Sequence, residues 1–203
     1  MKTLKNYMIL ILAFMALNIS TAQNIENIDK IAAFHEGLAA VKQGDRWGFI
    51  NEAGTMVIDF RTDVYIPHNG HPKFNDGYCL IFEEKEGITF FGYINTKGEV
   101  VIKPEYLAAT SFENGLAQVI KHYVTETGNT NALGKKIVKH TYNELVIDKY
   151  NKTVQHIRGP VNFLLEINAL QKNSPRILST FIAPKLIALH TNNDTFTIIK
   201  LKD

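Results

Sequence analysis

Side chains with metal-binding chemistry gather in one connecting segment of the sequence. His68 and His71 are two residues apart in "YIPHNGHPKFND", and Asp76 and Cys79 follow within the next eight positions. Imidazole, carboxylate and thiolate groups bind transition metals, but a site needs at least three of them converging on one point. Two histidines in a Pro/Gly-rich loop are more often solvent-facing. We therefore predict no metal site and no cofactor.

Cys79 is the only cysteine of the chain, so it cannot form an internal disulfide. Two similar stretches of the sequence carry Ala39 and Ala117 at the equivalent point. A free thiol packs as a small apolar group. The position is predicted to hold a small core residue and not a catalytic nucleophile.

The sequence lacks the short motifs that mark common catalytic sites, such as Gly-x-Ser-x-Gly, His-Glu-x-x-His and a phosphate-binding Gly-rich loop. Acidic residues in predicted connections are explained by solubility; these are Asp63, Glu83, Glu84 and Glu86. We predict no catalytic residues and a protein that is not an enzyme. One enzymatic alternative stays open, a hydrolase with its site in the 61–73 or 121–143 loop and with His68, His71 and His140 as candidates.

The elements that position these residues form an internal repeat. Three stretches open with Phe-x-x-Gly, at Phe34, Phe74 and Phe112, which are 40 and 38 residues apart. Periods of this size indicate stacked supersecondary units. Each copy continues with a strand, a connection, a second strand ending in Ile-Asn or Ile-Asp, a tight turn and a third strand rich in Val and Ile. The three phenylalanines are predicted to occupy equivalent places in a shared interior.

The turn between the second and third strands is the most informative part of each copy. It comprises residues 51–54, 95–98 and 148–151, which begin with Asn or Asp and end with Gly or Asn. The first side chain can accept hydrogen bonds from the turn's own amides, and the last residue tolerates a positive φ. These segments are predicted to be hairpin turns.

The strands carry apolar residues at adjacent positions, such as Phe49 with Ile50 and Val100 with Val101. Successive side chains of a strand point to opposite faces of its sheet, so both faces are predicted to be covered. A lone hairpin is marginal in water, and neighbouring units must supply the cover. The predicted fold is all-β, with tandem β-hairpin repeats stacked in an open, twisted repeat array.

The first copy, "GLAAVKQGDRWGFINEAGTMVI", resembles the tryptophan-glycine (WG) containing repeat. The usual form of that repeat is Gly-Leu-Ala-x-Val, a Trp-Gly-Phe/Tyr-Ile-Asp/Asn strand, two variable residues and Gly-x-Val-Val. The signature pair is Trp47-Gly48 in the first copy, Phe91-Gly92 in the second and Glu144-Leu145 in the third, which indicates a degenerate edge unit. Trp47 and Phe91 are predicted to be core aromatics. The resemblance covers about residues 34–157 and implies a bacterial, often exported protein with a binding or scaffolding role.

One connection is much longer than its counterparts. Val41 to Ile50 spans 9 residues and Ile81 to Ile94 spans 13, but Val119 to Ile147 spans 28, which is 28 − 9 = 19 more than the first. Insertions in repeat arrays often lie on the binding face. The extra residues, about 121–143, are predicted to extend a hairpin; the alternative is a protruding loop for partner contact. Its local positive charge would come from Lys135, Lys136 and Lys139.

Residues 1–22 have the features of a secretory signal peptide. Lys2 and Lys5 precede the apolar stretch 8–17, and Ser20 and Ala22 are small residues at a cleavage point. Ten apolar residues are too few for a transmembrane helix, which needs about 20. Cleavage near Ala22 predicts an exported chain, periplasmic or extracellular, without a transmembrane segment in its mature form.

Composition limits the possible partners. The chain has 203 residues, of which 45% are hydrophobic and 21% charged, as in ordinary globular proteins. Removal of residues 1–22 takes two lysines from 22 basic and 20 acidic residues, which leaves 20 against 20 and a net charge of zero. Bulk charge therefore gives no reason to expect a nucleic-acid partner.

We predict four parts in the chain: a signal peptide (1–22), an N-terminal segment (23–33), a WG-like repeat region (34–157) and a divergent C-terminal unit or cap (158–203). Within the last part, residues 185–201 predict a hairpin around Asn192-Asn193-Asp194. Residues 162–173 fit a strand or a short helix.

The sequence thus favours an exported, non-catalytic repeat protein that acts as a binding or scaffolding module. Its partner would be a protein or a cell-envelope polysaccharide. An alternative is a structural or assembly component of the cell envelope, whose edge strands pair with neighbouring molecules. The hydrolase is the third possibility.

Overall fold

The computed structural model describes residues 24–67, 70–130, 132–134, 136–162, 174–191 and 193–202. This part of the chain consists of antiparallel strands and their connections, which confirms the predicted all-β fold. Within it no helix is long and apolar enough to cross a membrane. The predicted signal peptide lies outside these ranges, as do residues 163–173, His68 and Lys135.

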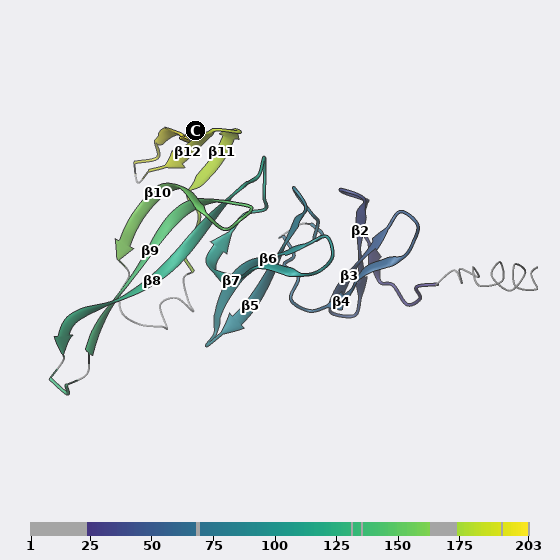
Figure 1. Ribbon diagram of the computed structural model, residues 1–203, viewed down its shortest axis with the longest axis horizontal. Coiled ribbons are helices and arrows are strands. Elements are labelled where there is room, and N and C mark those ends of the chain that lie inside the picture. The colour runs from purple at the N-terminus through teal and green to yellow at the C-terminus, as the bar shows by residue number, and fades with distance from the viewer. Residues whose placement is uncertain are drawn as a thin grey trace, which may run out of the picture.

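The strands lie side by side in nearly the order in which they occur in the chain. They are β1 (Lys30–Ile31), β2 (Leu38–Gln43), β3 (Arg46–Asn51), β4 (Met56–Arg61), β5 (Tyr78–Lys85), β6 (Ile88–Asn95), β7 (Val100–Ala109), β8 (Leu116–Thr130), β9 (Lys136–Asp148), β10 (Thr153–Asn162), β11 (Ser179–Ala183), β12 (Leu186–His190) and β13 (Phe196–Lys200). β1 to β4 form one sheet and β5 to β10 a second. A bridge between Val64 and Ile81 continues the pairing from the end of β4 to β5. The two sheets therefore form one open meander (Figure 1).

Three units of three strands repeat along this meander, β2–β4, β5–β7 and β8–β10 (Figure 1). We call them the first, second and third units. In the turn of the first unit, Asn51 Oδ1 accepts hydrogen bonds from the amides of Ala53 and Thr55, at 3.1 and 2.9 Å. Asn95 and Asp148 bond their own turns in the same way. Positive φ angles of 76°, 81° and 62° at Gly54, Gly98 and Asn151 confirm the predicted hairpin turns.

The glycine of the Trp-Gly signature lies where the third strand of a unit passes closest to the second. A Cβ atom on Gly92 would lie 2.4 Å from the carbonyl oxygen of Ile102, and one on Gly48 would lie 2.9 Å from that of Ile58. A larger residue would have to displace the strand. The third unit has Leu145 here, and β10 pairs with it in a different register. Leu145 is fully buried, so the departure from the signature leaves the third unit well packed.

The hydrophobic core is divided among the junctions between successive units, as the repeat predicts. The junction of the first and second units buries Leu38, Ala40, Trp47, Phe49, Ile58, Val64, Phe74, Cys79, Ile81 and Ile94. The junction of the second and third units buries Leu80, Tyr93, Ile102, Tyr106, Phe112, Ala117, Val119, Leu145 and Ile147. The second unit gives one face to each neighbour, since Ile81 belongs to the first junction and the adjacent Leu80 to the second.

Two of the three Phe-x-x-Gly phenylalanines occupy equivalent places in these junctions. Phe74 packs edge-on against Phe49 with ring centroids 4.9 Å apart, and Phe112 packs against Tyr93 at 4.8 Å. The prediction is wrong for Phe34, which is 48% exposed, whereas Phe74 and Phe112 are at most 2% exposed. Among the described residues no unit lies on the outer side of the first one to bury Phe34 as the neighbouring units bury Phe74 and Phe112.

The prediction of two covered faces is also wrong at the start of β7. Val100 and Val101 are 49% and 43% exposed. A β-bulge lies between the pairs Tyr93–Ile102 and Ile94–Val100, so that two residues of β6 face three of β7. A bulge bends its strand, and here the buried position is Ile102, which belongs to the junction core.

The C-terminal strands β11 to β13 form a separate antiparallel sheet that packs on the third unit. β12 and β13 pair from Leu186 with Lys200 to His190 with Phe196, which confirms the predicted hairpin. Buried residues at this contact are Val146, Ile187 and Leu201. The sheet thus covers the face of the third unit that points away from the second.

Candidate functional site

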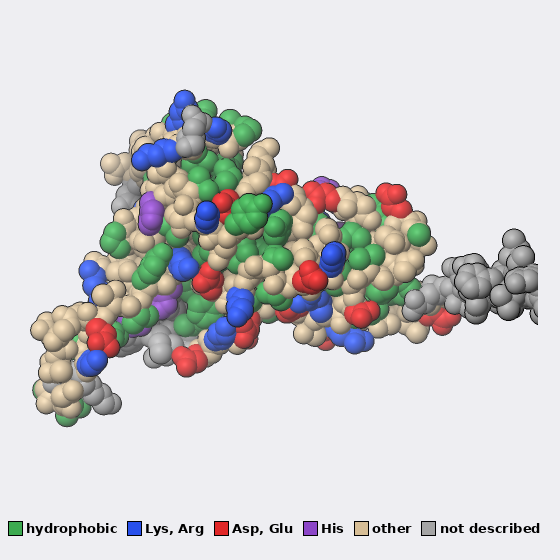
Figure 2. Space-filling view, in the orientation of Figure 1, with side chains coloured by type: hydrophobic (Ala, Val, Ile, Leu, Met, Phe, Trp, Pro, Cys, Tyr) green, Lys and Arg blue, Asp and Glu red, His purple; other side chains and the backbone are tan. Residues whose placement is uncertain are grey.

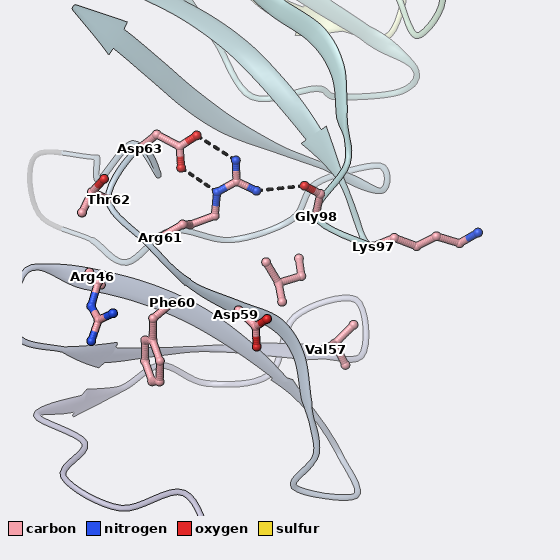
Figure 3. A pocket seen from close by; sticks show the side chains of 10 residues that line it. Arg46, Val57, Asp59, Phe60, Arg61, Thr62, Asp63, Lys97 and Gly98 are labelled. Atoms are coloured by element: carbon pink, nitrogen blue, oxygen red, sulfur yellow. Dashed lines mark hydrogen bonds and ion pairs between the residues drawn. The ribbon is translucent and has the colours of Figure 1, made fainter.

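A polar cleft lies where the first unit meets the turn of the second. Its volume is about 510 Å³ (Figure 3). One wall is β4 with the two residues after it, and the other is the end of the turn between β6 and β7. The lining residues are Arg46, Val57, Ile58, Asp59, Phe60, Arg61, Thr62, Asp63, Lys97 and Gly98. By its volume and charged lining, this cleft is one candidate for a ligand site.

Arg61 is the central side chain of the cleft, and its donors are used within the protein. Its Nε and Nη2 donate to the two carboxylate oxygens of Asp63 at 2.5 and 2.7 Å, and its Nη1 donates to the Gly98 carbonyl oxygen at 2.9 Å (Figure 3). The hydrogen bond to Asp63 raises the pKa of Arg61 against the opposing effect of burial. Lys97 points away from these groups (Figure 3). Arg61 therefore joins the first unit to the turn of the second.

The same contact recurs at the next junction with different side chains. Tyr106 corresponds to Arg61, because each pairs across the sheet with the first residue of its signature, Phe91 or Trp47. The Tyr106 hydroxyl donates to Asn151 Oδ1 at 2.5 Å, in the turn of the third unit. Because both junctions have such a contact, we infer that the polar residues of the cleft hold the first and second units together.

The structure does not bring together the metal-binding side chains of the connection after the first unit. His71 lies edge-on to Trp47 with ring centroids 5.8 Å apart, whereas Asp76 accepts a hydrogen bond of 2.6 Å from a backbone amide of the third unit. Cys79 is 2% exposed in the first junction, and burial raises the pKa of its thiol to about 12. Among the described residues no three His, Cys, Asp or Glu side chains are grouped to hold a metal ion.

The connection between the first and second units forms one wall of another cavity, of about 540 Å³. Its described lining is Ala32, Ala33, Phe34, His35, Leu38, Ala40, Pro67, Gly70, His71, Pro72 and Lys73. His35, His71 and Lys73 are the polar side chains of that lining, which includes no hydroxyl, thiol or carboxylate. A covalent hydrolytic mechanism uses such a group as its nucleophile, whereas His35 and His71 could act only as general acids or bases. The described lining holds no such nucleophile.

The long insertion of the third copy is an extended hairpin, made of the outer halves of β8 and β9. Beyond Lys121, which pairs with Tyr106 of β7, and Thr141, which pairs with Asn162 of β10, the two strands pair with each other alone in the described structure. We call residues 122–130 and 136–140 the arm. Figure 1 shows the arm extending well beyond the other strands of its sheet. The predicted extension of a hairpin is therefore what the structure shows.

The arm has apolar side chains on both faces. Tyr123 lies opposite Thr141, and the next residue Val124 lies opposite His140 on the other face. Tyr123, Val124 and Ile137 are 37%, 55% and 36% exposed. These three exposed apolar residues were not among the candidates from the sequence, which were the lysines of the insertion. The signal was present in the β-branched and aromatic residues, which favour strands over loops.

The charges of the arm are partly neutralised. Lys136 Nζ donates to both carboxylate oxygens of Glu126, at 3.1 and 2.8 Å, while Lys139 is exposed. At the base of the arm, His122 Nε2 and His140 Nδ1 are 3.0 Å apart. Burial and the neighbouring His140 lower the pKa of His122. Of the two described lysines of the arm, one is therefore paired with a carboxylate and the other is exposed.

Comparison with known families agrees with this repeat architecture. The sequence model of the WG containing repeat matches residues 27–47, 47–61 and 91–122. These matches confirm the resemblance to the WG containing repeat at these three segments of the chain. Residues 144–157, the second half of the third copy, lie outside the matched segments. No match was found among curated proteins or among solved structures.

Proposed function

We propose that the protein is an exported, non-catalytic scaffold of WG containing repeats that binds another protein through the arm. The observation that supports this most directly is the apolar surface on both faces of the arm, where Tyr123, Val124 and Ile137 are exposed. An isolated two-stranded ribbon is marginal in water. Exposed apolar surface of this kind is common where another molecule binds.

The backbone of the arm offers a second means of binding. Past Lys121, the edge of β8 that faces β7 closer to the body has no partner strand among the described residues. Such an edge can accept an added strand from another chain, which would bond the backbone of β8 from Tyr123 onward and cover neighbouring side chains. A protein therefore suits the arm better than a polysaccharide does.

The remaining surface supports binding over other roles. Figure 2 shows acidic and basic side chains interspersed over the repeat units in view, with basic side chains gathered at the top over the C-terminal sheet. In the cleft between the first two units, the lining residues Arg61 and Asp63 are already engaged with each other in an ion pair. Export is proposed from the signal-peptide features of residues 1–22.

A test needs an arm deletion that leaves the sheet intact. Tyr123 and Thr141 face each other directly, so residues 124–140 can be replaced by Asn-Gly, which closes a two-residue hairpin. Affinity capture would compare the chain from Gln23 with this variant in an extract of the producing cells. We expect one specific protein to be captured by the intact chain and lost from the variant.

A point variant provides a finer comparison. Val124→Asp places a charge on the exposed apolar face of the arm and should reduce capture by at least about tenfold, whereas Phe196→Asp changes an exposed residue of the C-terminal sheet and should not. Equal capture by all variants would contradict the proposal. An obligate oligomer in sedimentation would favour the envelope-assembly alternative. A hydrolytic activity abolished by joint substitution of His68, His71 and His140 would favour the enzyme.

A further inference from the structure

Each unit begins with a two-residue turn that follows its Phe-x-x-Gly phenylalanine. In the first unit the amide and carbonyl groups of His35 and Leu38 bond each other, at 2.9 and 3.1 Å. Asn75 with Tyr78 and Glu113 with Leu116 make the same pair of bonds. The two central residues have positive φ in all three units, 52° and 76° at Glu36 and Gly37 of the first. We call these the entry turns.

A carboxylate of each of the first two entry turns binds the entry turn of the next unit. Glu36 Oε1 accepts a hydrogen bond of 2.7 Å from the Asp76 amide, and Glu36 Oε2 accepts one of 2.8 Å from the Gly77 amide. Asp76 Oδ2 in turn accepts one of 2.6 Å from the Gly115 amide. Hydrogen bonds to an ionised acceptor are stronger than neutral ones. The entry turns are thus linked in series along the array.

The first central residue of each entry turn has a side chain that suits its place in this series of linked turns. Glu36 and Asp76 have φ of 52° and 53°, a region that Gly, Asn and Asp adopt at less cost than Glu and most other residues. The third entry turn has Asn114 at the same point, with φ of 52°, and no further Phe-x-x-Gly turn follows it in the sequence. An acid therefore occurs where a following entry turn must be bound, and Asn occurs where none follows.

The first entry turn lacks the partner that the other two have. No hydrogen bond from the amide of Glu36 or of Gly37 to any described residue is formed, whereas the Asp76, Gly77 and Gly115 amides each bond a carboxylate. Two apolar side chains near it are exposed as well, although Ala39 and Val41 of the same unit are buried. Ile31 is 65% exposed, and Val64 at the equivalent strand position is 2% exposed. Phe34 differs from Phe74 and Phe112 in the same way.

We propose that this open end binds the Asp or Glu side chain of a β-turn in a partner protein, with the partner's apolar strand face covering Phe34 and Ile31. Two adjacent amides match the two oxygens of a carboxylate, as Glu36 shows with the second entry turn. The partner would present to the first unit what the first unit presents to the second, a carboxylate in a β-turn and an apolar strand face. This surface is separate from the arm and does not depend on the function proposed for it.

None of the described residues supplies this carboxylate. Residues 1–23 contain no Asp or Glu. A second copy of the chain would have to offer Asn114 from its last entry turn, and its third unit is covered by the sheet of β11 to β13. A different protein with an acidic β-turn therefore fits best.

The first unit provides the probe. A peptide copying residues 34–51 would be held as a hairpin by a disulfide between cysteines replacing Gln43 and Arg46, which face each other across the strands. It would be titrated into the isotope-labelled chain from Gln23 and followed by NMR. We expect the Glu36 and Gly37 amide signals of the chain to move downfield and saturate. The same peptide with Glu36→Gln should bind at least about tenfold more weakly.

Variants of the labelled chain locate the site. Phe34→Asp should abolish binding, because it removes the apolar contact and repels the carboxylate, while the exposed control Phe196→Asp should bind like the parent chain. Equal binding of the Glu and Gln peptides would overturn the proposal, as would absence of any shift at Gly37 with a peptide whose cross-strand contacts show that it is folded. Self-association of the chain at Gly37 without peptide would identify a second copy as occupant and reject a different protein.

Discussion

Glu144 accepts a hydrogen bond of 2.8 Å from the backbone amide of Ser179, in the C-terminal sheet. The Leu178 amide donates to the same carboxylate at 3.2 Å, and the Ser179 hydroxyl bonds it as well. Glu144 is fully buried and occupies the position that Trp47 holds in the first unit. The residue that departs from the WG signature therefore attaches the C-terminal sheet to the third unit.

Glu144→Ala should lower the free energy of unfolding by about 1–3 kcal/mol, because the buried Ser179 amide and the part-buried Leu178 amide lose their acceptor. Urea denaturation would measure the loss, and limited proteolysis within residues 174–202 should become faster. Glu84→Ala removes an exposed carboxylate from β5 and should change stability by less than about 0.5 kcal/mol. Equal effects of the two substitutions would show that the buried contact does not hold the sheet.

Glu36→Gln should lower the free energy of unfolding by about 1 kcal/mol, since an amide side chain has one acceptor oxygen for the two amides that Glu36 binds. Denaturant titration provides the measurement. Asn114→Asp is the matched control, because it adds a carboxylate to an entry turn with no following partner. It should not stabilise the chain. A stabilising Asn114→Asp would indicate that the acid acts within its own turn.

Gly92→Ala should destabilise the second unit by about 1–3 kcal/mol, since the new Cβ would lie 2.4 Å from the Ile102 carbonyl oxygen. Gly70→Ala is the control, because its nearest neighbouring atom would be at 3.7 Å, an ordinary contact distance. Thermal melting would compare the two. An unaffected Gly92→Ala chain would mean that β7 moves freely away from β6.

Cys79→Ala should be tolerated at a cost below about 1.5 kcal/mol, because Ala39 and Ala117 fill the equivalent buried positions. In the native chain the thiol should react very slowly with alkylating reagents at pH 8, since its pKa is raised to about 12 by burial. Mass spectrometry after timed labelling would follow the reaction. Rapid labelling under native conditions would show that the first junction opens readily.

Acidification should weaken the base of the arm. The pKa of His122 is lowered in the folded chain by burial and by His140, so the unfolded chain binds this proton first as the pH falls. Stability is expected to decrease as the pH drops below the ordinary histidine value of about 6.5. Urea denaturation at several pH values would show a smaller decrease for His122→Gln than for the parent chain, and an equal decrease in both would contradict this role of His122.

Local chemistry made part of the fold predictable. The Asn51 turn and its two counterparts depend on side chains bonding amides two and four residues away, which a sequence displays directly. The exposure of Phe34 depends on whether a further unit precedes the first, which its own motif does not report. The bond from Glu36 to the second entry turn joins residues about forty positions apart. It can be seen only when the two copies lie next to each other in the folded structure.

The candidate site was predictable in outline only. The length of the third connection marked the arm, but its register, and hence the exposure of Tyr123 and Val124, depends on where β7 and β10 end. In the sequence, Glu144 indicates only a degenerate third copy, because the strand that it binds, β11, has no repeat motif. Residue type alone did not reveal that contact.

The series of linked entry turns has a consequence for how such a chain can lengthen. A segment of 40 residues separates Phe34 from Phe74. It includes one complete unit with both groups of its entry turn, the acidic side chain and the two adjacent amides. Tandem duplication of that segment would supply a new acid for the turn downstream and a new amide pair for the acid upstream. The gene could therefore gain or lose modules in single steps while each boundary stays matched.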